Sequence, residues 1–175
     1  VYEKDVLSIL DGLSSVLSCG DVSLNYVDSY TKVRKDWNLK NDAYATWLEV
    51  KKAENGDFVF GLNEEKVKEY FETIRTFVDS LALDAKFAIE NNKVEEFQAS
   101  QSGINLNFDQ TFKDLDRAFV ERNYSPSELT KTISISVDVV KPKVEISQIN
   151  DLGIVDVIGM GYSTFHDSHT NRIKN

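Results

Sequence analysis

The chain has 175 residues, of which 41% are hydrophobic and 28% are charged, and its formal net charge is −9. A chain of this length and composition can bury one full core, which excludes an intrinsically disordered protein. The acidic excess repels phosphate backbones and anionic lipid surfaces, so nucleic acid is not expected as a partner. No apolar run approaches the roughly 20 residues of a membrane helix, so no membrane insertion is predicted.

The first residues, "VYEKDVLSIL", lack the basic start and long apolar stretch of a signal peptide. Because the chain also starts without Met, we expect it to be a segment of a longer protein whose targeting sequence lies upstream. The chain has one cysteine, Cys19, which cannot form an internal disulfide and is expected to fill space at a helix end.

The first predicted element is a helix over residues 5–18. Its apolar residues recur at i, i+4, i+7 and i+11, which predicts one apolar stripe formed by Val6, Leu10, Leu13 and Leu17. A half-buried strand follows, in which Val22, Leu24 and Tyr26 alternate with polar residues. The stretch from there to about residue 45 is polar and less regular.

A hairpin is predicted next, with strands at 47–51 and 58–60 joined by "ENGD", whose Asn-Gly pair suits a tight turn. Asn63 is the expected N-cap of the following helix, and Glu64 and Glu65 lie at its positive end. The apolar stripe predicted for this helix consists of Val67, Phe71, Ile74, Val78 and Leu81.

A second hairpin, "AKFAIE" and "KVEEFQA" around "NN", precedes a third helix. Asp109 is the expected cap of that helix, which presents Phe112, Leu115 and Phe119. The segment "TISISVDVV" then predicts one strand, with Ile133, Ile135, Val137 and Val139 on one face.

These elements predict an α+β fold, in which antiparallel hairpins pack with three amphipathic helices. Two segments also look alike, because helix, strand and "TKV" at 31–33 recur as helix, strand and "PKV" at 142–144. The strands align at an offset of 111 residues and the helices at a shorter one. We interpret this as an internal helix–strand repeat whose first copy lacks its front half, with chance similarity as the alternative.

Few residues indicate chemistry. His166 and His169 have the i, i+3 spacing of metal ligands, but the surrounding Gly, Ser and Thr favour solvated loop histidines, and no metal or cofactor is predicted. The adjacent Glu95 and Glu96 point to opposite faces of a strand, so they cannot flank one glycosidic bond together. No nucleophile triad or phosphate loop is recognisable, so no catalytic residue is assigned.

Two groups of residues are candidates for ligand binding. The polar loop "SQSGINLNFD" offers donors and acceptors at Gln101, Ser102, Asn105 and Asn107, although such a loop can also serve only its own backbone. The rings of Tyr44 and Trp47 could stack on sugars, although aromatic residues in such patterns are more often core.

The order of these signals resembles the peptidoglycan-binding domain found in bacterial surface proteins. The family pattern of a "DA-F" strand, a hairpin, then "G", "L", "D" and a helix is matched by Asp84, Ala85, Phe87, Gly103, Leu106 and Asp109. The tail "LGIVDVIGMGYSTFHDSHTNRIKN" is similar to the opening of a VanW-like region, with Ser163, Phe165, Arg172 and Asn175 at the family positions.

The resemblance implies three segments: the second half of a truncated first repeat at 1–40, the peptidoglycan-binding domain at 41–150, and the start of a VanW-like region at 151–175. It implies an extracytoplasmic location in the bacterial cell envelope, with peptidoglycan as partner, and we expect a monomer. The predicted function is a non-catalytic module that binds peptidoglycan or spaces the adjoining domain. The alternatives are part of a cell-wall enzyme whose catalytic residues lie elsewhere, and a purely structural repeat arm.

Overall fold

The computed structural model describes residues 3–53, 55–90 and 93–145. These fall into two compact units, which are considered separately. The first unit consists of Val1–Leu81 and Gly103–Val140, and the second of Ala82–Ser102 and Lys141–Asn175. The predicted tail motif residues Ser163, Phe165, Arg172 and Asn175, and the histidines His166 and His169, lie outside the described residues.

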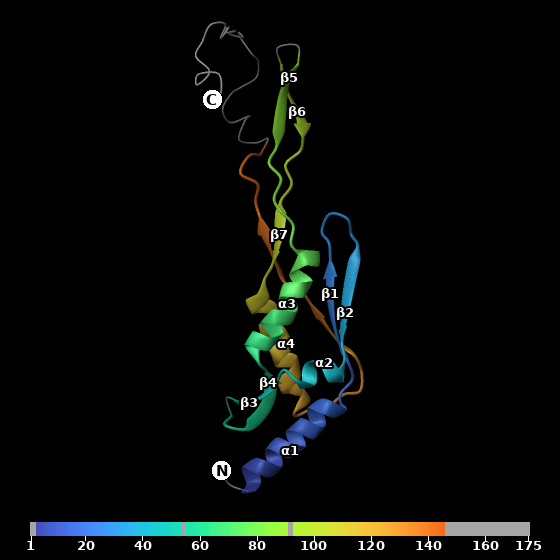
Figure 1. The fold of residues 1–175 in the computed structure, drawn as a ribbon, viewed down its shortest axis with the longest axis vertical. Helices are drawn as coiled ribbons and strands as arrows, with labels where there is room; N and C mark the ends of the chain where they lie inside the picture. The colour runs from blue at the N-terminus through green and yellow to red at the C-terminus, as the bar shows by residue number, and fades with distance from the viewer. Residues whose placement is uncertain (1–2, 54, 91–92, 146–175) are drawn as a thin grey trace, which may run out of the picture. The chain divides into compact units, whose positions relative to one another are not determined.

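The first unit holds most of the secondary structure (Figure 1). In chain order its elements are α1 (Glu3–Ser18), β1 (Val22–Val27), β2 (Arg34–Leu39), α2 (Asn41–Ala45), β3 (Leu48–Lys52), β4 (Phe58–Leu62), α3 (Glu64–Val78), β7 (Gly103–Leu106), α4 (Phe108–Arg122), β8 (Lys131–Ser134) and β9 (Val137–Val140). The mixture of helices with small, mainly antiparallel sheets confirms the predicted α+β class.

The sheets of the first unit are small, and each strand pairs with one or two others. One sheet has the order β2-β1-β8, in which β2 pairs with β1 antiparallel and β8 pairs with β1 parallel. The antiparallel hairpin β3–β4 has the predicted strands, and Gly56 in its turn has a φ of 91°, which glycine adopts without steric cost. Strand β7 pairs antiparallel with β9.

The predicted strand "TISISVDVV" at 132–140 is divided in two. Its first part, β8, pairs with β1, and its second part, β9, pairs with β7. Ile135 lies between them and is buried, whereas Val139 is exposed, so the predicted apolar face does not run along the whole segment. The change of pairing partner explains the break, because β1 and β7 belong to different sheets and one continuous strand could not pair with both.

The core of the first unit lies among α3, α4, β1 and the β3–β4 hairpin. As predicted, Asn63 caps α3 by accepting a hydrogen bond from the Lys66 N–H. The buried stripe of α3 consists of Val67, Phe71, Ile74 and Val78. The prediction that Leu81 also belongs to this stripe is wrong. Leu81 is 88% exposed because the helix ends at Val78, before the chain reaches the next turn of the stripe.

Two details of the other helices differ from prediction. The N-cap of α4 is Asn107 and not Asp109, since the Asn107 side chain accepts from the Gln110 N–H and Asp109 lies in the first turn. Helix α1 forms as predicted but buries a different face: Val16 is fully buried, whereas Val6, Leu10 and Leu17 are exposed. Two elements in the polar stretch, β2 and α2, were not predicted.

The second unit contains the hairpin of β5 (Lys86–Glu90) and β6 (Lys93–Gln98), which matches the predicted one. Asp84 lies ahead of it, and its carboxylate accepts from the N–H groups of Lys143 and Val144 at 2.6 and 3.2 Å. The Ala85 N–H donates to the Val144 carbonyl at 3.0 Å. The "DA" of the family pattern therefore holds the "PKV" segment against the start of this hairpin.

Within the described ranges, no helix has the length and apolar character needed to cross a bilayer.

Candidate functional site

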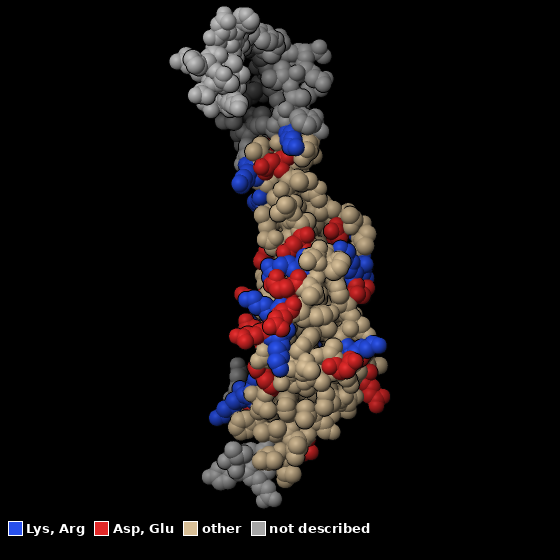
Figure 2. All heavy atoms as spheres, viewed as in Figure 1, with Lys and Arg blue, Asp and Glu red and all other residues tan. Residues whose placement is uncertain are grey.

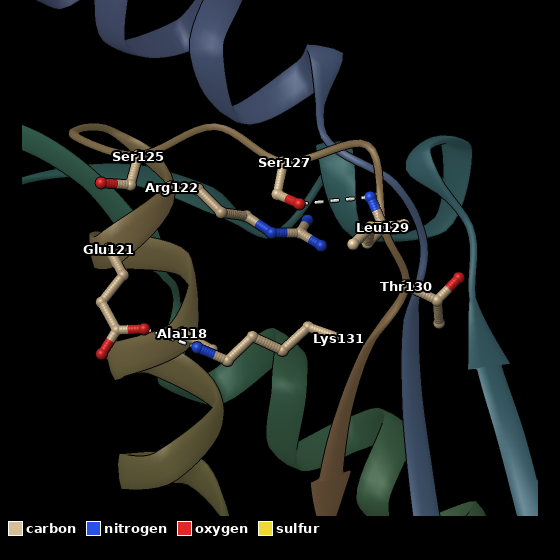
Figure 3. A pocket seen from close by; sticks show the side chains of 8 residues that line it. All are labelled: Ala118, Glu121, Arg122, Ser125, Ser127, Leu129, Thr130 and Lys131. Carbon is tan, nitrogen blue, oxygen red and sulfur yellow. Dashed lines mark hydrogen bonds and ion pairs between the residues drawn. The ribbon is translucent and has the colours of Figure 1, made fainter.

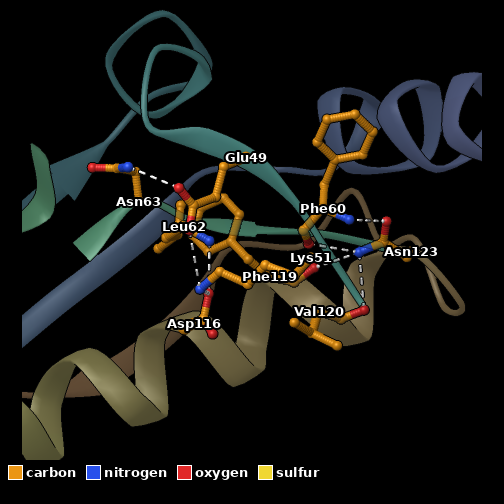
Figure 4. Close-up of polar contacts among 9 residues, drawn as sticks. All are labelled: Glu49, Lys51, Phe60, Leu62, Asn63, Asp116, Phe119, Val120 and Asn123. Carbon is orange, nitrogen blue, oxygen red and sulfur yellow. Dashed lines mark hydrogen bonds and ion pairs between the residues drawn. The ribbon is translucent and has the colours of Figure 1, made fainter. Parts of the chain in front are cut away.

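Helix α4 covers the open edge of strand β4. Because β3 occupies one edge of β4, alternate N–H groups of β4 point the other way. The first such N–H group belongs to Phe60 and donates to the Asn123 side chain at 2.8 Å (Figure 4). The same side chain donates to the Phe60 carbonyl at 2.8 Å, so Asn123 makes both hydrogen bonds that a neighbouring strand would make. Asp116 fills the next, accepting from the Leu62 N–H at 2.6 Å.

The same carboxylate fixes a lysine of the hairpin. The Asp116 carboxylate lies 3.0 Å from the Lys51 ammonium, which is also 3.7 Å from Glu49 (Figure 4). A β-carbon at Gly61 would lie 2.7 Å from Asp116 Oδ1 and 2.8 Å from Lys51 Cδ, so any other residue here would have to displace these two side chains. These contacts set the distance between β3 and α4.

A groove of about 790 Å³ follows the junction between β3 and α4. Four basic residues line it, namely Lys51, Lys52, Lys113 and Arg117, together with one carboxylate, Asp116. Two aromatic side chains, the half-buried Phe112 and the exposed Tyr124, also contribute to its wall. We call this set of residues the cationic groove.

The positive lining of the cationic groove is a local feature. The chain as a whole has a net charge of −9, and on the face drawn in Figure 2 basic and acidic side chains are interspersed. Arg117 pairs with Asp114 at 3.4 Å, but within the described part of the chain no ion pair engages Lys52 or Lys113. The cation that lies over the Phe112 ring, 5.4 Å from its centre, is the ammonium of Lys51. Ammonium groups without a carboxylate partner, such as those of Lys52 and Lys113, can bind the carboxylate of a ligand.

A second, smaller pocket of about 330 Å³ lies between the end of α4 and the start of β8 (Figure 3). Arg122 reaches into it and is only 4% exposed, and its guanidinium donates to the Gly20 carbonyl at 2.6 Å. The same guanidinium lies 4.8 Å from the Phe119 ring centre and 5.5 Å from that of Tyr44. Arg122 thus ties the loop after α1 to α4, which is a structural role.

The aromatic candidates Tyr44 and Trp47 lie in the core. Tyr44 is fully buried, with its ring edge-on to Phe119 at 4.8 Å, and burial raises the pKa of its hydroxyl. Trp47 is 9% exposed and lies 5.1 Å from the Tyr70 ring. Neither ring presents a face to solvent on which a sugar could stack.

The four polar candidates are divided between the two units. Gln101 and Ser102 belong to the second unit, where Gln101 pairs with Leu83 through backbone hydrogen bonds. Asn105 and Asn107 belong to the first, where Asn105 is exposed on β7 and Asn107 caps α4. The Asn107 amide also donates to Asp138 at 3.0 Å, so its polar atoms already have partners within the fold.

The family-pattern residues have structural positions. Phe87 lies in β5, Gly103 and Leu106 begin and end β7, and Asp109 lies in the first turn of α4. The residues of the cationic groove were not predicted. The signal for them was present in the sequence: Lys113 and Arg117 are four residues apart on a helix, and Lys51 and Lys52 precede the turn.

Nowhere in the described residues do three or more His, Cys, Asp or Glu side chains come together as a metal site would require.

Comparison with known proteins shows the family. Residues 17–127 match the family described as "Putative peptidoglycan binding domain", and because the match covers more than half of the chain, the chain belongs to this family. The matched range includes all of the residues that line the cationic groove. No curated protein matches the chain in sequence.

Two solved structures are similar at a low level. One is an Enterococcus faecium L,D-transpeptidase C442S mutant, at 14% identity and a TM-score of 0.45, covering 74% of this chain and 45% of that one. The other is the Ldtfm-avibactam carbamoyl enzyme, at 14% identity and a TM-score of 0.41, covering 73% of this chain and 44% of that one. The chain therefore spans less than half the length of either protein.

Proposed function

We propose that this chain is a non-catalytic module that binds peptidoglycan through the cationic groove. The observation that carries the proposal is the family match, since it covers both walls of the groove. Family membership associates the chain with the cell wall. We further propose that the module lies on the outer side of the cytoplasmic membrane, as a monomer, and spaces an adjoining VanW-like domain.

The groove chemistry supports a peptide stem as the bound group. Peptidoglycan stems carry free carboxylates, and Lys52 and Lys113 offer ammonium groups that no carboxylate of the described residues neutralises. The apolar side chains and acetamido groups beside those carboxylates can pack on Phe112 and Tyr124. The acidic remainder of the surface opposes binding elsewhere on the molecule.

The test is sedimentation of the chain with purified peptidoglycan sacculi. We expect the wild-type chain to pellet with sacculi, and the double variant Lys52→Glu/Lys113→Glu to bind at least about tenfold more weakly, because both cations become anions. The matched control is Lys40→Glu/Lys86→Glu, which makes the same charge change at exposed lysines outside the groove. Binding should also weaken at about 1 M salt, where the Debye length is about 3 Å.

Two results would reject binding through the cationic groove, and a third would reject the non-catalytic assignment. Equal losses in both double variants would mean that net charge and not the groove governs binding. No sedimentation of the wild-type chain above background would favour a structural arm without a ligand. Release of soluble fragments from sacculi by the chain alone would overturn the non-catalytic assignment.

A further inference from the structure

Helix α1 carries apolar residues on two sides, and only one side is covered. On the covered side, Val16 is fully buried and Ile9 and Leu13 pack against the core. The uncovered side exposes large apolar side chains by 37 to 56%, at Val6, Leu7, Leu10 and Leu17. Val6, Leu10 and Leu17 have the spacing i, i+4 and i+11, so they lie along one face of the helix.

The uncovered face matches a covered face elsewhere in the same molecule. When "VLSILDGLSSVL" at 6–17 is aligned with "FDQTFKDLDRAF" at 108–119 of α4, the four most regular apolar positions coincide. Val6, Leu10 and Leu17 of the uncovered side fall on Phe108, the half-buried Phe112 and Phe119, and Leu13 of the covered side falls on the buried Leu115. Each helix leads into a strand, and those strands, β1 and β8, lie side by side in parallel pairing.

The structure shows what covers this face in α4. The Phe108 ring packs edge-on against Phe71 of α3, with ring centres 5.7 Å apart, and Phe119 packs against Tyr44 of α2 at 4.8 Å. Phe108 is 7% exposed and Phe119 is fully buried as a result. The covering unit is therefore the segment 41–78, which contains α2, the β3–β4 hairpin and α3. We call it the hairpin–helix unit.

We propose that the exposed face of α1, formed by Val6, Leu7, Leu10 and Leu17, is a docking surface for a second hairpin–helix unit, supplied by another copy of this domain. Docking would bury the apolar residues that α1 now exposes, which stabilises the contact by the hydrophobic effect. It would extend the protein by stacking one repeat on the next. This proposal does not depend on peptidoglycan binding.

The test joins a second copy of residues 40–107 ahead of the full chain and measures amide hydrogen exchange by mass spectrometry. We expect exchange in α1 to slow at least tenfold relative to the chain alone, while exchange in β1 and β2 stays within twofold. A second fusion carrying Val6→Phe, Leu10→Phe and Leu17→Phe gives α1 the ring volume of α4 and should strengthen the protection.

The double variant Leu10→Glu/Leu17→Glu provides the control. Because both side chains are exposed, it should leave the unfolding midpoint of the chain alone unchanged but abolish the added protection in the fusion. Residues 41–78 already pack against α4 in that molecule, so an added copy that exchanges as an unfolded chain in both fusions would overturn the proposal. A dimer of the chain alone that Leu10→Glu/Leu17→Glu dissociates would also overturn it, in favour of α1 pairing with itself.

Discussion

Replacement of Phe119 by alanine is expected to destabilise the protein by about 3–5 kcal/mol, the range for removing a fully buried aromatic ring. The Phe119 ring is 0% exposed, contacts Tyr44 edge-on, and lies under the guanidinium of Arg122. Its loss would leave a cavity and also remove the nearer of the two aromatic rings beside the buried Arg122 guanidinium. Urea unfolding followed by circular dichroism would measure the effect as a shift in midpoint.

Phe77→Ala is the matched control for Phe119→Ala. Phe77 is 57% exposed, and its main contact is the Lys35 ammonium 5.8 Å from the ring centre. We expect its loss to cost less than about 1 kcal/mol. If the two alanine variants unfold at the same urea concentration, the core does not lie where α3 and α4 meet, and the fold described above is wrong.

Replacement of Asp116 by alanine is expected to cost about 2–3 kcal/mol, because it removes a charged acceptor from the buried edge of β4. The Leu62 N–H would lose its partner, and the Lys51 ammonium would lose its nearest carboxylate. Urea unfolding followed by circular dichroism would measure this cost.

The control for Asp116→Ala lies half a turn earlier on the same helix. Asp114 pairs with Arg117 at 3.4 Å and with Gln110 at 2.8 Å, both on the helix surface. Surface pairs of this kind contribute about 0–1 kcal/mol, so Asp114→Ala should be nearly neutral. An equal cost for Asp114→Ala and Asp116→Ala would show that the β4 edge is not held by α4.

The elements that were predicted best are those in which capping residues, charge placement and apolar spacing all indicate the same structure. In α3 a capping Asn63, acidic residues in the first turn and a regular apolar stripe all indicate the same helix, and the structure has it. Helix α1 was predicted with the wrong buried face because its apolar residues cover two arcs. Which arc is buried depends on contact with β4 and α4, and sequence periodicity does not contain that information.

Strand β2 was missed for a different reason. Its sequence "RKDWNL" has only Trp37 and Leu39 as apolar residues, and it forms because β1 offers a pairing edge. The split between β8 and β9 has the same origin, since the neighbouring strands and not the local alternation decide where each part pairs. Tertiary pairing therefore determined both outcomes.

The cationic groove could not be assembled from sequence because its walls are far apart along the chain. Lys52 lies in β3 and Lys113 in α4, and the hydrogen bonds of Asp116 and Asn123 to β4 bring those elements together. Those two side chains occur on the helix without any motif to mark them. Tyr44 and Trp47 were candidates for stacking on sugars, but both are buried, as large aromatic side chains of a small domain usually are.

The most direct test of the central claim is a nuclear magnetic resonance titration of the full chain with soluble stem-peptide fragments of peptidoglycan. The account predicts saturable shifts in backbone amides at 51–53 and 112–117, which vanish in Lys52→Glu/Lys113→Glu and persist in Lys40→Glu/Lys86→Glu. Shifts that gather on any other surface, or a spectrum that stays unchanged at millimolar fragment, would contradict it.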